Sequence, residues 1–161
     1  MQLPDAIAQA AAPVFEALPL DQAMPDLVPS AAAGSPVVDA VQAAVAHPAL
    51  ADHPELQAGL WLYADDLDAS HTISQSIDTP TGSYWHAIMH RREGDFGNCK
   101  YWYRLAGDHP VLAEISPGFD PDAFVDDVQR TANAPTAELL DLQRREWTAL
   151  FQWCANQDAG G

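Results

Sequence analysis

The chain has 161 residues, enough for one domain with a buried core, and its 48% hydrophobic and 19% charged residues are typical of a globular protein. The net charge is -16, with 23 acidic against 7 basic residues, which argues against nucleic acid or an anionic membrane as a partner. The first residues lack the basic segment of a secretory signal, and no apolar run is long enough to cross a membrane. We therefore expect a cytoplasmic protein.

The first half of the chain predicts short helices separated by proline-rich turns. Residues 1–18 carry an apolar stripe with helical spacing, and residues 19–35, which contain three prolines, predict a surface linker. A Ser-Pro pair starts the next predicted helix, 35–46, which should end before a His-Pro pair. Two further helices are expected over residues 55–67 and 68–77.

The second half is predicted to be helical as well. A helix is expected over residues 84–93, ended by glycine, and another begins at an Asp-Pro pair and covers 121–128. The clearest apolar stripe in the chain predicts a last helix over 135–157. The predicted fold class is mainly α, a single compact helical domain over residues 1–161, with a short strand or hairpin left open near residues 96–115.

Chemically reactive side chains gather in one central stretch, residues 70–109. It contains four of the six histidines, four of the seven basic residues and five of the nine tryptophans and tyrosines. The two cysteines lie outside any CxxC pair, so two free thiols are the simpler expectation, with a disulfide as the alternative. The central stretch is therefore the predicted location of function.

The histidines of this stretch have the spacing of a metal site. His86 and His90 are four residues apart on a predicted helix, so both rings lie on one face. His71 lies on the preceding element, and Glu93 follows His90 by three residues. Three histidines and a carboxylate suit a divalent transition metal, Zn²⁺, Fe²⁺, Ni²⁺ or Mn²⁺. The alternatives are unrelated structural roles for each histidine, or acid–base chemistry without an ion.

Other side chains of the stretch are candidates for a surrounding pocket. We expect Glu93, Gln75 and Lys100 to take part in catalysis, as groups that orient a histidine or contact substrate. Aromatic, amide and basic groups that are able to stack on a ligand or hold an anion form the predicted ligand-binding set: Tyr84, Arg91, Arg92, Asn98, Tyr101 and Arg104. The alternatives are ion pairs with nearby acids for the basic residues and core packing for the aromatic ones.

These patterns predict a small cytosolic metal-dependent enzyme, a hydrolase, lyase or isomerase, that acts on a small polar or anionic substrate. The alternative is a non-enzymatic module that uses the same pocket to bind a small ligand or a protein partner.

The run SHTISQSIDTPTGSYWHAIMHRREGDFGNCKYWYRLAGDHPV, residues 70–111, resembles a group of uncharacterised bacterial proteins that share a WHxIMHRREGDFxNxKYW core. The resemblance covers about a quarter of the chain and carries no activity, cofactor, fold or mechanism with it.

Overall fold

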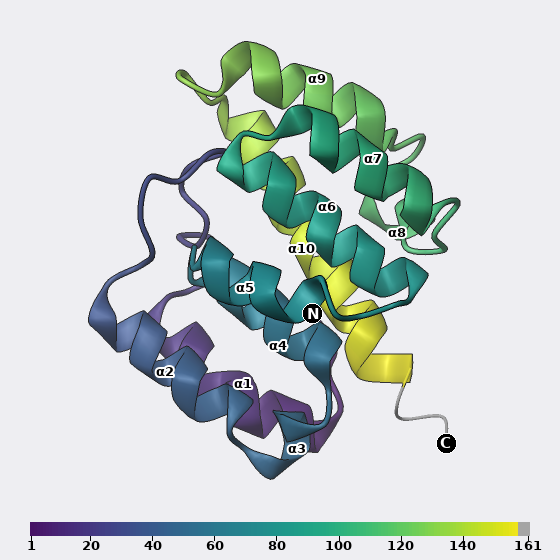
Figure 1. Ribbon diagram of the computed structural model, residues 1–161. Coiled ribbons are helices and arrows are strands. Elements are labelled where there is room, and N and C mark those ends of the chain that lie inside the picture. The colour runs from purple at the N-terminus through teal and green to yellow at the C-terminus, as the bar shows by residue number, and fades with distance from the viewer. Residues whose placement is uncertain (158–161) are drawn as a thin grey trace.

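The computed structural model describes residues 1–157, which form ten α-helices and no strand (Figure 1). The helices are α1 (Asp5–Ala17), α2 (Ser35–Val45), α3 (Pro48–Ala51), α4 (Pro54–Tyr63), α5 (Leu67–Ser74), α6 (Pro80–Glu93), α7 (Phe96–Ala106), α8 (Leu112–Ile115), α9 (Pro121–Thr131) and α10 (Ala137–Gln157). The prediction of a mainly α domain is confirmed.

Two local predictions need correction. The segment left open as a strand or hairpin forms α7 and α8 instead, because the buried residues Cys99, Tyr103 and Ala106 recur at helical spacing. Helix α4 ends at Tyr63, earlier than predicted, because the chain turns at Asp65, whose φ of 57° lies in the left-handed region.

Within residues 1–157, no helix is both long enough and apolar enough to cross a membrane.

Helix α6 is the centre of the fold and lies between α5 and α7, with α10 behind it (Figure 1). Its start is defined by Thr79, whose hydroxyl accepts a hydrogen bond from the Gly82 N–H at 3.0 Å, and by Pro80 in the first turn. Its end is defined by Gly94, which has a φ of 86°. Every residue from 84 to 92 is buried. The helix is therefore surrounded by protein, and its polar side chains need partners inside the domain.

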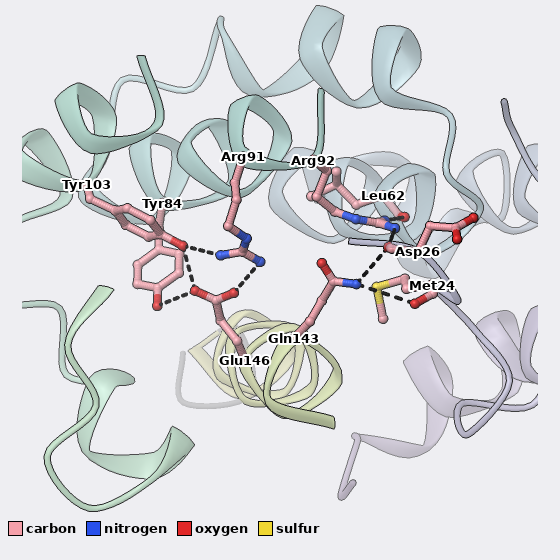
Figure 2. Close-up of polar contacts among 9 residues, drawn as sticks. All are labelled: Met24, Asp26, Leu62, Tyr84, Arg91, Arg92, Tyr103, Gln143 and Glu146. Atoms are coloured by element: carbon pink, nitrogen blue, oxygen red, sulfur yellow. Dashed lines mark hydrogen bonds and ion pairs between the residues drawn. The ribbon is translucent and has the colours of Figure 1, made fainter. Parts of the chain in front are cut away.

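A buried ion pair joins α6 to α10 (Figure 2). Arg91 and Glu146 are both fully buried, and Nη2 of Arg91 lies 2.6 Å from Oε2 of Glu146. The hydroxyls of Tyr84 and Tyr103 donate to Oε1 of Glu146 at 3.1 and 2.6 Å. Burial alone would lower the pKa of Arg91, but the Glu146 carboxylate outweighs it and raises that pKa. The pair is therefore charged and holds α6, α7 and α10 together.

A second buried pair fixes the proline-rich segment 19–35. Arg92 lies 2.7 Å from Asp65 and donates to the carbonyl oxygens of Leu62 at 2.9 Å and Asp26 at 3.1 Å. Gln143 of α10 donates to the same Asp26 carbonyl (Figure 2). The segment is non-helical over 19–34, as predicted, but it is more than a surface linker: three of its side chains are buried, those of Ala23, Met24 and Leu27.

The three His-Pro pairs mark turns, as their sequence indicates. His47 caps α3, where its Nδ1 accepts from the Ala49 N–H, and His53 is the residue before α4. Both cysteines, Cys99 and Cys154, are buried and are not joined by a disulfide, as expected.

His109 connects the turn before α8 to the start of α6. Its Nδ1 accepts from the Val111 N–H at 3.3 Å, and its Nε2 lies 3.0 Å from the Thr81 hydroxyl. An acceptor at Nδ1 requires the neutral ring, with the proton on Nε2 donated to Thr81. Burial lowers the pKa of His109, which favours the same neutral form.

We predict that replacing Glu146 with Gln lowers the free energy of unfolding by about 3–5 kcal/mol, because Arg91 is left as an uncompensated buried charge. Urea denaturation measures the change. Asp141→Asn is the matched control, since it removes a carboxylate from an exposed ion pair with Arg145 and should cost about 1 kcal/mol or less. Equal losses in the two variants would contradict the assigned role of the buried pair.

We predict that His109 makes stability depend on pH. In the unfolded state His109 takes up a proton near its ordinary pKa of 6.5, whereas in the folded state it does so only at lower pH. The stability that neutral His109 contributes is therefore fully present above about pH 6.5 and is lost as the pH falls toward the folded-state pKa. In urea titrations from about pH 8 to about pH 5, His109→Gln should lose less stability than the parent. If the free energy of unfolding of the variant changes with pH as steeply as that of the parent, His109 is not the source of the pH dependence.

Candidate metal centre

Three histidines converge between α5 and α6. His71 comes from α5, and His86 and His90 come from successive turns of α6. One ring nitrogen from each lies within 4.8 Å of the others, so the three are positioned to hold a metal ion. Tetrahedral coordination with metal–nitrogen bonds of about 2.0–2.1 Å needs nitrogens about 3.4 Å apart. Coordination of one ion would require the three ring nitrogens to adopt that separation and the rings of His86 and His90, which are stacked with centroids 4.7 Å apart, to reorient.

His86 is the most deeply buried member of this histidine triad. It is only 3% exposed, and neither of its ring nitrogens has a hydrogen-bond partner among residues 1–157. The indole of Trp102 stacks on it, with ring centroids 3.9 Å apart and planes 22° apart. Burial, together with the neighbouring His90 and His71, lowers the pKa of His86 from 6.5 to about 4. At neutral pH the ring is therefore uncharged and keeps a nitrogen lone pair.

His90 is oriented by Glu93. Nδ1 of His90 lies 2.5 Å from Oε1 of Glu93, one turn further along α6. A carboxylate accepts at that position, so the Nδ1 proton points to Glu93 and Nε2 is left as the coordinating nitrogen. Glu93 was predicted as a fourth ligand, but it lies behind His90 and is not part of the group formed by the three histidines. It belongs to a second group of possible metal ligands, which also includes His90 and Asp95. Asp95 also accepts two hydrogen bonds from Asn98.

His71 is the accessible member of the triad. It is half-buried, and its ring centroid lies 4.9 Å from that of His86 and 5.6 Å from that of His90. The preceding residue, Ser70, is buried and donates to the Ala58 carbonyl at 2.9 Å, which attaches α5 to α4. The short helix that carries His71 is therefore fixed at this point, while the His71 side of the triad is open to solvent.

A groove of about 420 Å³ lies on the far side of Trp102 from His86, and none of the three histidines lines it. It is lined by residues 75–80 together with Ser83, Trp102 and Leu105. Gln75 follows His71 by four residues and Ser83 precedes His86 by three, so helical geometry places each on the side of its helix that carries a histidine. Of the predicted catalytic residues, Gln75 is the one that lines this groove.

The basic residues of the central stretch lie elsewhere. Arg91 and Arg92 are buried in the ion pairs that hold the core, and Lys100 pairs with Asp126 at 2.7 Å. Arg104 is exposed and lines a separate depression beside the start of α9. The structure therefore brings none of these four cations to the groove beside the histidines.

The remaining predicted ligand-binding residues are also dispersed. Tyr84 is buried and bonded to Glu146, Asn98 donates to Asp95 at the start of α7, and Tyr101 is 48% exposed. Sequence reasoning missed Glu146 as the partner of Arg91. The sequence feature that could have indicated its burial is its position midway between Leu142 and Leu150, on the apolar face of the last helix.

Comparisons of the chain with protein-family models, curated proteins and solved structures found no match.

Proposed function

We propose that His71, His86 and His90 bind one divalent transition-metal ion, and that the chain is a metal-dependent enzyme that acts on a small polar substrate beside that ion. The observation that carries the proposal is the environment of His86. Its two ring nitrogens are buried without a partner in the described part of the chain, while one nitrogen from each of the other two histidines lies within 4.8 Å of a ring nitrogen of His86.

The energetics favour a ligand at this position. An unsatisfied buried polar group costs about 1–3 kcal/mol, so native proteins rarely retain one without a reason. Coordination of an ion by His86 would remove this cost for one nitrogen. It would also use the Nε2 lone pair of His90, which the Glu93 hydrogen bond leaves free.

Three histidine ligands support a catalytic rather than a purely structural ion. Structural zinc sites usually have four protein ligands, whereas catalytic sites have three and keep one position for water or substrate. The half-buried His71 is the side from which that position is reached. The ion would act as a Lewis acid or activate a water molecule, as a hydrolase, lyase or isomerase requires.

Zn²⁺ is the first choice of metal, and Fe²⁺, Ni²⁺ and Mn²⁺ are the alternatives with the same kinds of ligand. The Glu93 carboxylate behind His90 has the arrangement of a carboxylate–histidine–metal relay, in which the outer group orients the ring and increases its basicity. A cytoplasmic location is part of the proposal and is supported by the acidic composition and by two thiols that are not joined in a disulfide.

We predict that the purified protein binds about one equivalent of a transition metal per chain and that His71→Ala lowers the affinity more than about a hundredfold, beyond the range for outer-shell partners. Elemental analysis and metal titration measure the two quantities. His71 is half-buried, so this variant is expected to fold, and His86→Gln is the second variant.

The matched control is His47→Asn, which replaces an exposed histidine far from the triad in sequence and keeps an acceptor for the Ala49 N–H. It should bind metal as the parent does. A parent that takes up no metal, or folded His71→Ala and His86→Gln variants that bind as the parent does, would show that the proposed site is wrong.

We predict that Glu93→Gln lowers metal affinity about 10–100-fold while the stoichiometry stays the same, because Glu93 orients a ligand without being one. Its side chain is 40% exposed, so the fold should be retained. Glu114→Gln makes the same change of charge at an exposed position on α8 and controls for general electrostatics. Equal metal affinities in the two variants would show that Glu93 has no role in the metal site.

A further inference from the structure

The groove beside the triad has the composition of a binding site for an uncharged molecule. Among the described residues that line it, Asp78 is the one charged side chain, and it is negative. The four cations of the central stretch do not line it, and three of them are engaged with Glu146, Asp65 and Asp126. The side chains that line the groove would therefore repel an anionic ligand through Asp78 and provide no cation to bind it.

The same groove presents polar groups without partners in the part of the chain that the structure describes. The Gln75 amide, the Ser83 hydroxyl and the indole N–H of Trp102 make no hydrogen bond to other described residues. Other hydroxyls of the lining are engaged, since Ser76 donates to the Ile73 carbonyl and Thr79 caps α6. The side chains of Gln75, Ser83 and Trp102 are thus available to form hydrogen bonds with a ligand.

Trp102 links the groove to the triad. One part of its indole stacks on His86, and the residue also lines the groove and is partly exposed. An aromatic ring of this kind binds the apolar face of a ligand, while neighbouring amide and hydroxyl groups bind its polar edge. A volume of about 420 Å³ suits a small molecule.

The rim of the groove is built tightly. The turn over residues 75–79 packs against the start of α6 at Gly82, where an added Cβ would lie 2.4 Å from the Ile77 carbonyl oxygen. Only glycine permits this approach. The side chains that face the groove are therefore supported by a close backbone contact.

We infer that the groove binds an uncharged, hydroxyl-bearing molecule with one apolar face, of which a monosaccharide is the simplest representative, and that this molecule is the substrate of the proposed metal-dependent enzyme. The inference depends on the proposed function and narrows its substrate class: the groove lining favours an uncharged molecule over the small anions that the cluster of basic residues in the sequence had suggested.

The test compares methyl α-D-glucopyranoside with D-glucuronate on the metal-loaded protein, with the NMR signal of the Trp102 indole as the readout. Trp102→Phe assigns that signal. We expect the neutral glycoside to shift it and to bind at least about tenfold more tightly than the anion. Gln75→Ala combined with Ser83→Ala should weaken the glycoside's binding, whereas Gln42→Ala, at an exposed position outside the groove lining, should not.

Asp78→Asn provides an independent check. The loss of its charge should improve glucuronate binding relative to the glycoside, whereas Asp68→Asn, an exposed acid on α5 outside the groove lining, should leave the ratio unchanged. Tighter binding of the anion by the parent protein, or no shift of the Trp102 signal with the glycoside, would overturn the inference.

Metal content, measured on the same samples, separates this failure from failure of the proposed function. Bound metal without glycoside binding overturns the groove inference and leaves the metal site. Glycoside binding by a protein that takes up no metal overturns the proposal of a metal-dependent enzyme and supports a non-enzymatic binding module.

Discussion

The ion pair between Arg91 and Glu146 is the interaction on which the rest of this fold depends. Moving each charge out of water costs several kcal/mol, and the attraction repays that cost only when every partner is correctly placed. Here Tyr84 and Tyr103 complete the shell of the carboxylate, and the guanidinium lies 4.5 Å from the centre of the Phe124 ring. Because these groups come from α6, α7, α9 and α10, satisfying one pair of charges specifies how four helices meet.

The same constraint determines the geometry of the histidine triad. Consecutive residues of an α-helix point about 100° apart, so His90, Arg91 and Arg92 face three directions. Arg91 is held against α10 and Arg92 against the segment around Asp26, which leaves His90 facing His71. The rotation of α6 about its axis is thus fixed by buried charges on two sides. The two histidines of α6 cannot turn away with their helix without breaking an ion pair in the core, whereas His71 is positioned separately by α5.

Local features of this fold were predictable from sequence, and long-range ones were not. Turn residues and apolar spacing indicate most of the helices, and the four-residue spacing of His86 and His90 is enough to place them on one helix face. The proximity of His71 depends on how α5 folds back onto α6, which the short turn only suggests. Sequence also shows that Arg91 and Arg92 are cations in an acidic chain, but not that they are buried, because Glu146 and Asp65 become their partners only through tertiary packing.

The distribution of charge bears on both the proposed metal site and the proposed neutral ligand. Of the basic residues in the described part of the chain, five form ion pairs within the protein and Arg144 donates to the Ala23 carbonyl. With a net charge of -16, the surface that remains is dominated by carboxylates. Such a field concentrates cations near the molecule and repels anions. The same field would favour a divalent ion at the histidines, and Asp78 adds a further negative charge to the groove. A chain that needed to capture anions would not place its two central arginines in the core.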